Sequence, residues 1–97
     1  MTTYILLINW TDQGIRSVKD SAKRLDAARN MLGSMGGSFD KFYLTMGEYD
    51  MAAICEAPDD RVMARFTLTL AMAGNVRTKT LKAFSEVNYR EIIGSLS

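Results

Sequence analysis

The sequence has no histidine, one cysteine and one proline among its 97 residues. The missing histidine excludes serine–histidine–aspartate triads and leaves structural zinc without its usual nitrogen ligands. The single cysteine, Cys55, cannot build a disulfide framework. Twelve basic residues against eleven acidic ones give a net charge of only +1. That balance removes the electrostatic argument for nucleic acid or an anionic membrane, so we expect neither as a partner. Because the chain has no histidine and only one cysteine, we also expect no metal or other cofactor.

Long apolar runs are missing as well, and no stretch approaches the ~20 apolar residues of a membrane span. Residues 1–4 carry no cluster of positive charge, and the apolar run at 5–8 is too short for the core of a signal peptide. We therefore expect a cytoplasmic protein in which Cys55 remains a reduced, buried thiol. The composition, 47% hydrophobic and 24% charged, is typical of a globular fold, and the length predicts a single domain over residues 1–97.

Four segments carry the residue patterns of β-strands. Residues 3–9 and 50–57 are apolar on both alternating faces, which is typical of strands covered on both sides. Residues 38–46 alternate, with Phe39 and Phe42 predicted on opposite faces of a half-buried strand. Residues 76–83 carry Arg77, Lys79 and Lys82, a charge content that favours an edge strand. The segments 3–9 and 50–57 are therefore the candidates for the centre of a sheet.

Helical patterns fill the gaps between these strands. After a cap at Thr11 or Asp12, apolar residues recur every three or four positions from 15 to 35. Because Asp20 or Ser21 could begin a fresh helix, this element is either one helix or two. A second helix begins near residues 58–60 and ends before the glycine and asparagine at 74 and 75. Ser85 can cap a short closing helix whose apolar residues share one side.

The order β-α-β-β-α-β predicts an α+β, ferredoxin-like βαββαβ fold. Its four-stranded antiparallel sheet would have the order 4-1-3-2 with both helices on one face, which makes the two doubly apolar strands central. The other face would then expose apolar side chains, each worth about 1.5–3 kcal/mol when buried. A second copy packed sheet against sheet removes this exposure and encloses space for a small apolar or amphipathic molecule. The alternative is a monomer whose closing helix folds across the open face.

Four short segments point to a known family. They are Thr11-Asp12-Gln13-Gly14-Ile15-Arg16, Gly47-Glu48-Tyr49-Asp50, Glu56-Ala57-Pro58-Asp59-Asp60 and Gly74-Asn75-Val76-Arg77-Thr78. Together, over residues 4–84, they resemble the bacterial GYD domain family, whose signature is glycine, a variable residue, tyrosine and aspartate. The resemblance implies a dimeric α+β barrel related to cofactor-free monooxygenases, isomerases and haem enzymes. It implies no catalytic residues, because the family has no assigned reaction.

The segment Gly47-Glu48-Tyr49-Asp50 has two interpretations. As a hairpin turn, it needs glycine for a positive φ, tyrosine to cover the end of the sheet and aspartate to accept backbone N–H bonds. As a reactive pair, the Tyr49 phenol and the Asp50 carboxylate would act as acid and base at the mouth of a cavity. Turn composition favours the structural interpretation, and Tyr49 and Asp50 are the only candidates for catalysis.

Other polar and aromatic residues lie near the predicted strand ends, where ligand crevices often form. Asn9, Trp10 and Gln13 could offer amide hydrogen bonds and an aromatic wall, although a helix-entry turn explains Gln13 and the following glycine equally well. Arg77 could bind a carboxylate or an enolate with two hydrogen bonds, or serve as an edge-strand charge. The predicted ligand-binding residues are Asn9, Trp10, Gln13, Tyr43, Tyr49, Asp50 and Arg77.

These observations lead to three hypotheses about function. The first is a homo-oligomeric module, a homodimer or a higher oligomer, that holds a small apolar or amphipathic ligand between the sheets or at the sheet end. The second is a cofactor-free enzyme, a monooxygenase or an isomerase, that acts on a small activated phenol or enol. Its substrate would lie among Asn9, Tyr49, Asp50 and Arg77. RNA binding, the third, is set aside because residues 50–56 carry neither an aromatic nor a basic side chain.

Overall fold

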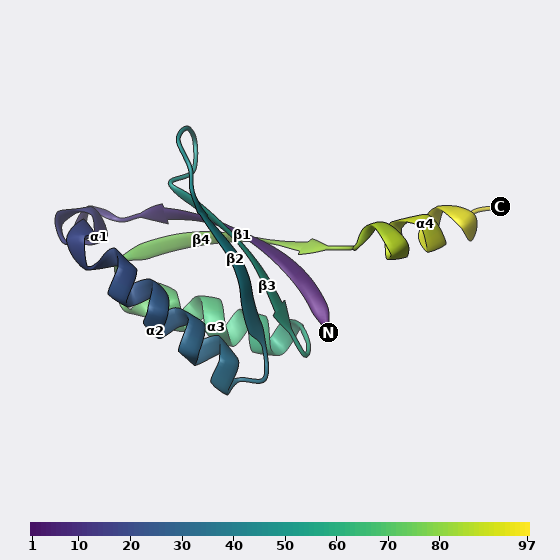
Figure 1. Cartoon of the computed structure of the whole chain (residues 1–97), viewed down its shortest axis with the longest axis horizontal. Coiled ribbons are helices and arrows are strands. Elements are labelled where there is room, and N and C mark those ends of the chain that lie inside the picture. The colour runs from purple at the N-terminus through teal and green to yellow at the C-terminus, as the bar shows by residue number, and fades with distance from the viewer.

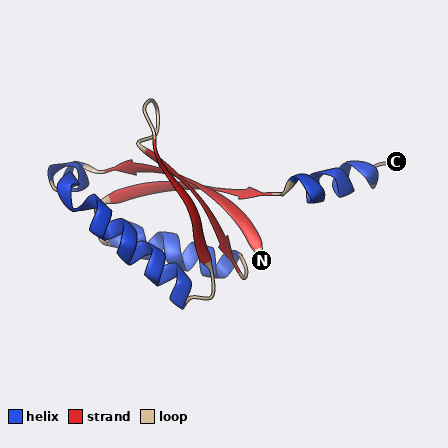
Figure 2. Ribbon diagram, viewed as in Figure 1, coloured by secondary structure: helices blue, strands red, loops and turns tan.

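The computed structural model describes residues 1–97, which form an α+β fold with one four-stranded antiparallel sheet (Figure 1). The elements are β1 (Thr2–Trp10), α1 (Asp12–Arg16), the 3-10 turn η1 (Val18–Asp20), α2 (Ser21–Ser34), β2 (Ser38–Leu44), β3 (Met51–Ala57), α3 (Asp60–Met72), β4 (Val76–Ala83) and α4 (Glu86–Gly94). The strands lie in the order β2-β3-β1-β4, as predicted. Helices α2 and α3 cover one face of the sheet (Figure 2). The predicted ferredoxin-like βαββαβ topology is therefore confirmed.

The core lies between the sheet and these two helices. On β1, Tyr4, Leu6 and Ile8 are buried and alternate with half-buried residues, which is the period of two expected of a strand. Leu32 of α2 and Phe66 of α3 close this layer from the other side, and both are fully buried. Burying a large apolar side chain contributes about 1.5–3 kcal/mol, so this single layer supplies most of the hydrophobic stabilisation.

The segment predicted as one helix or two forms two helices, α1 and α2, joined by η1. Thr11 caps α1, as predicted, and its side-chain oxygen accepts the N–H of Gly14 at 3.0 Å. Arg24 of α2 stabilises the break, because its guanidinium donates hydrogen bonds to the backbone carbonyls of Ser17 and Gly14. In a continuous helix those carbonyls would bond to N–H groups four residues further on, so the arginine replaces helical bonds that the break removes.

The prediction for the two faces of β2 is wrong in one respect. A β-bulge between Phe39 and Lys41 shifts the register against β3, so Phe39 and Phe42 both pack against the core. Their ring centroids are 6.4 Å apart, and Phe39 also makes an edge contact with Phe66 of α3. The strict alternation expected from the sequence would have turned one of the two rings away. The strand also ends at Leu44, two residues earlier than predicted.

Helix α4 projects away from the rest of the molecule (Figure 1). Ser85 caps it, as predicted, by accepting the N–H of Asn88 at 3.1 Å. Every residue of α4 is exposed, so the alternative in which the closing helix folds across the open face is wrong. The Cα radius of gyration is 14.7 Å, against about 12.5 Å for a compact chain of this length. None of the helices has the length and apolar composition that crossing a membrane requires.

Candidate functional site

The open face, the side of the sheet opposite α2 and α3, has an apolar centre. Ile5 of β1 pairs in register with Ile54 of β3 on one side and with Leu81 of β4 on the other. Directly paired residues share a face of the sheet, so these three side chains form a continuous row. Leu81 is 50% exposed, and Tyr43 of β2, on the same face, is 53% exposed. Adjacent exposed apolar side chains of this kind mark interaction sites.

Polar side chains lie at the end of the open face where β1 ends. Asn9 is directly opposite Arg77 of β4 in the strand register. Lys79, two residues further along β4, places its Nζ 5.7 Å from the centre of the Tyr49 ring, within the range of a cation–π contact. The structure therefore brings three of the predicted residues, Asn9, Tyr49 and Arg77, to one end of the open face.

Asp50 holds the β2–β3 hairpin to the end of β1. Its carboxylate Oδ2 accepts the backbone N–H of Trp10 at 3.0 Å, and its own backbone N–H donates to Asn9 Oδ1 at 2.9 Å. Gly47, in the same hairpin, has a φ of 129°, a conformation that glycine adopts without strain. No hydrogen bond joins the Tyr49 phenol to this carboxylate. The geometry therefore fits the turn interpretation of the segment, with Asp50 accepting a main-chain N–H.

The remaining predicted residues lie elsewhere. Gln13 Nε2 donates to the Ala73 carbonyl at 3.1 Å and to Asn75 Oδ1 at 3.2 Å, so this side chain ties α1 to the turn before β4. The Trp10 ring packs against the core on the helix side of the sheet. Tyr43 lies on the open face but on the edge strand β2. The structure thus does not bring the seven residues together at one site, and their role in binding a ligand stays a prediction.

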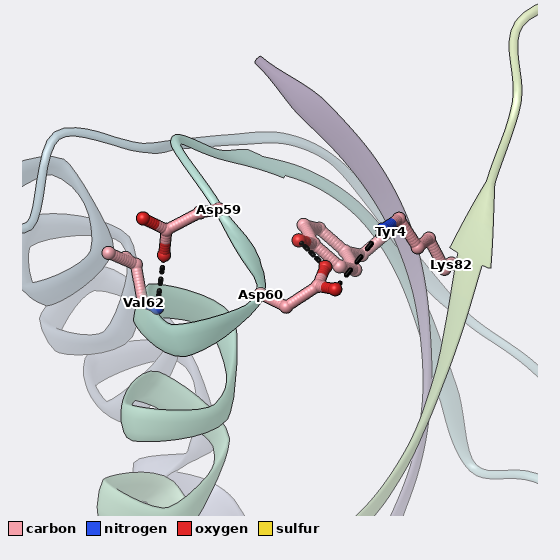
Figure 3. A network of polar contacts seen from close by, with 5 residues as sticks. All are labelled: Tyr4, Asp59, Asp60, Val62 and Lys82. Atoms are coloured by element: carbon pink, nitrogen blue, oxygen red, sulfur yellow. Dashed lines mark hydrogen bonds and ion pairs between the residues drawn. The ribbon is translucent and has the colours of Figure 1, made fainter.

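A polar cluster that the sequence patterns did not indicate joins α3 to the sheet (Figure 3). The Tyr4 hydroxyl donates to Asp60 Oδ1 at 2.6 Å, and Lys82 Nζ lies 3.1 Å from Asp60 Oδ2. Burial, and then the hydrogen bond to Asp60, raise the pKa of Tyr4 to about 12. The hydrogen bonds from Tyr4 and Lys82 lower the pKa of Asp60. The neighbouring Asp59 carboxylate, also drawn in Figure 3, instead accepts the N–H of Val62. Nowhere do three cysteine, aspartate or glutamate side chains gather to hold a metal ion.

One feature of the sequence could have indicated part of this cluster, namely the acidic residue at the start of a predicted helix. Tyr4 and Lys82 are directly paired in the β1–β4 register, and Asp60 occupies the first turn of α3. An acidic residue is expected at a helix N-terminus, where the helix dipole favours negative charge. What no local pattern revealed is that α3 places this turn beside the start of β1, which depends on how the helix packs on the sheet.

Comparisons with known proteins identify the family. The family model described as GYD domain matches residues 4–93 of the chain. The chain belongs to the GYD domain family. Among curated proteins, this GYD domain is 33% identical over 84 residues to a Thermus thermophilus protein named "Glutamine synthetase and cystathionine beta-lyase binding protein". That alignment covers 86% of this chain and 88% of the relative, and the resemblance carried by the four sequence segments is confirmed.

Solved structures share the fold of this GYD domain. The crystal structure of TTHA0845 from Thermus thermophilus matches with a TM-score of 0.55 at 23% identity, over 88% of this chain and 95% of that one. The leucine response regulatory protein of Mycobacterium tuberculosis matches with a TM-score of 0.57 at 15% identity, over 87% of this chain and 51% of that one. At these identities the likeness concerns the fold alone.

The signature residues of this GYD domain lie at the polar end of the open face. Gly47 supplies the positive φ of the hairpin, the Tyr49 ring contacts Lys79, and Asp50 bonds to the main chain of β1. Each of the three therefore shapes the hairpin where it meets Asn9 at the end of the sheet. The segment that defines the family thus sets the form of one end of a surface whose centre is apolar.

Proposed function

We propose that this GYD domain is a self-associating module that binds other proteins. The observation that carries the proposal is the amount of apolar surface that one copy leaves uncovered, on the open face and on α4. The row formed by Ile5, Ile54 and Leu81 has no helix above it, because α2 and α3 both lie on the other side. A second copy of the chain that packs on this face would remove the row from water.

Helix α4 supports self-association independently of the sheet. Its large apolar side chains, with the leucine that follows it, are between 43% and 68% exposed; they are Val87, Tyr89, Ile92, Ile93 and Leu96. A helix of nine residues is marginal in water unless its apolar side packs on something. In the proposed assembly, α4 of each copy lies against the neighbouring copy, which supplies that surface.

The polar end of the open face would then lie at the rim of the space between two sheets. Asn9, Arg77 and the Tyr49 ring are placed to contact the polar part of a small amphipathic molecule held there. The proposed homo-oligomer is a homodimer or a higher oligomer. We also propose that it holds the small ligand between its sheets. A cofactor-free enzyme has less support, because the Asp50 carboxylate that would act as its base bonds to the Trp10 N–H.

We extend to this chain the kind of partner that is named for its relative. A protein 33% identical over 86% of the chain is named for binding glutamine synthetase and cystathionine beta-lyase. We therefore propose that this GYD domain binds an enzyme of this kind. A small, rigid sheet with an uncovered apolar face and an exposed helix offers the surface that such binding requires.

The oligomeric state tests the first part of the proposal. By size-exclusion chromatography with light scattering, the wild-type chain is expected to run as a dimer or a larger species at micromolar concentration. Leu81→Asp on the open face and Ile93→Asp on α4 should each shift it towards the monomer, because both bury a charge in the proposed contacts. Leu68→Asp is the matched control, since Leu68 is 65% exposed on α3 and lies outside both surfaces. A wild-type monomer at that concentration contradicts the proposal.

Binding to enzymes is tested separately. Glutamine synthetase and cystathionine beta-lyase of the source organism are immobilised, and binding of the wild-type chain is followed by biolayer interferometry. We expect saturable binding to at least one enzyme, unchanged in the Leu68→Asp control. If the chain is oligomeric but binds neither enzyme, the proposed self-association is still supported and the proposed class of partner is wrong.

A further inference from the structure

An apolar cavity of about 270 Å³ lies on the helix side of the sheet, away from the open face. It opens between the N-terminal half of α2 and the C-terminal end of α3, where β1 ends and β4 begins. Its walls are mostly hydrophobic, and they include Trp10, Leu25, Ala28, Phe42, Leu70 and Val76. A cavity of about 150 Å³ already accommodates benzene, so this one has room for a ring or a medium-length alkyl chain.

Arg24 is the only charged side chain of the cavity wall, and it has no partner of opposite charge. This half-buried guanidinium donates to the carbonyls of Gly14 and Ser17 and to the Ser17 hydroxyl, all of which are neutral. Trp10 contributes its ring to the wall, whereas its Nε1–H is buried within the protein. A half-buried cation at the edge of an otherwise uncharged cavity favours a bound group that supplies negative oxygen.

We infer that this cavity is a binding site for a small apolar carboxylate, such as a medium-chain alkanoate or an aryl carboxylate. Arg24 supplies the charge and the hydrogen bonds for the carboxylate. The hydrophobic walls hold the tail of the ligand. This combination, an apolar cavity with a few placed polar groups, is the usual composition of a small-molecule site. The inference goes beyond the proposed function, because the cavity and the open face lie on opposite sides of the sheet.

Tryptophan fluorescence tests the site directly, because Trp10 is the only tryptophan of the chain. Sodium octanoate is titrated into the full-length protein, and octanol, its uncharged counterpart, is titrated in parallel. We expect a saturable change in Trp10 emission with octanoate at a concentration about tenfold lower than with octanol, since only the carboxylate makes charge-assisted hydrogen bonds.

Variants of α2 separate the charge from the cavity. Arg24→Gln should weaken octanoate binding about tenfold and leave octanol binding unchanged, whereas Arg24→Lys, which keeps the charge, should retain most of the affinity. Lys23→Gln is the matched control, because Lys23 is exposed on the same helix and does not line the cavity. Circular dichroism confirms that each variant keeps the helical content of the wild type.

Three results would overturn the inference. The first is the absence of any saturable change in emission with octanoate. The second is equal affinity for octanoate and octanol in the wild type, which would make the cavity apolar space without a carboxylate site. The third is an emission spectrum that depends on protein concentration and not on octanoate, which would assign the cavity to a side chain of a second copy.

Discussion

Tyr4 is the residue whose chemistry the fold changes most visibly. Its ring is buried on β1, and its hydroxyl donates to the carboxylate of Asp60. Burial and the nearby negative charge both disfavour the phenolate, so the pKa of Tyr4 rises to about 12. A group that titrates at a higher pH in the folded state than in the unfolded state makes stability depend on pH in the interval between the two values.

The first prediction concerns this interval. In the unfolded chain, tyrosine ionises near pH 10. The contribution of Tyr4 to the free energy of unfolding is therefore complete below about pH 10 and is lost as the pH rises towards 12. Tyr4→Phe should lower the free energy of unfolding by about 1 kcal/mol at neutral pH and remove this part of the alkaline loss. Urea unfolding across the alkaline range measures both effects. Tyr89→Phe, at an exposed position, should behave as the wild type, and equal alkaline slopes in Tyr4→Phe and wild type would contradict the prediction.

The second prediction concerns Cys55, which is fully buried as the sequence suggested. Burial raises the pKa of its thiol to about 12, so almost no thiolate is present at neutral pH. We expect the native protein to be inert to dithiobis(nitrobenzoate) and to react with one equivalent once urea unfolds it. Rapid reaction of the folded protein would show that β3 opens far more readily than its burial implies.

At the scale of elements, α1 lies in close contact with the turn before β4. The Thr11 N–H donates to the Asn75 carbonyl at 3.0 Å, and the Thr11 hydroxyl donates to the Gly74 carbonyl. A Cβ atom on Gly14 would lie 1.9 Å from the Asn75 carbonyl oxygen, a distance that no rearrangement of a side chain can relieve. Gly14 is therefore needed for close approach of two backbones, a role that neither the ligand crevice nor the helix-entry turn proposed from the sequence had anticipated.

The third prediction follows from this contact. Gly14→Ala should destabilise the protein by about 2–4 kcal/mol, because α1 must move away from the turn before β4. Gly33→Ala is the matched control: Gly33 lies in α2 with no atom near its would-be Cβ, and the change should stabilise the protein by up to about 1 kcal/mol. Chemical denaturation measures both variants. A Gly14→Ala protein as stable as the wild type would mean that α1 does not hold this position.

At the scale of the whole molecule, the chain is elongated because α4 stands apart from the sheet and its helices (Figure 1). Its principal extents are 52, 31 and 18 Å. Apolar side chains are exposed along α4 and on the open face, two parts of the molecule that one copy does not bring together. If the proposed self-association is correct, folding and association share the same stabilising contacts.

The fourth prediction is that stability depends on protein concentration. If association buries α4 and the open face, a tenfold increase in concentration should raise the thermal unfolding midpoint by about 2–4 °C. Differential scanning calorimetry over a concentration series measures this shift. The Ile93→Asp variant, with its charge on α4, should show a midpoint that no longer moves with concentration. A constant midpoint in the wild type would show that the folded unit is the single chain.

Much of the fold could be predicted because its signals are local. Apolar spacing every two residues marked the strands, spacing of three or four marked the helices, and glycines marked their ends. The same rule of alternation could have separated Asn9 from Trp10, since neighbouring residues of a strand point to opposite faces. Grouping the two in one candidate site neglected that rule, and the structure places the Trp10 ring in the cavity on the helix side.

By itself, the sequence determined the order of the elements, their caps, the arrangement of the strands and the family, because each depends on residues close together in the chain or on rules of strand connection. Only the tertiary structure decided the bulge that turns Phe39 and Phe42 to the same side, the bond from Asp50 to β1, and the position of α4. It also decided that Arg24 and Trp10, which lie in different elements of the chain, line one cavity. These features arise from contacts between distant segments, whose geometry is set by packing and not by any local pattern of residues.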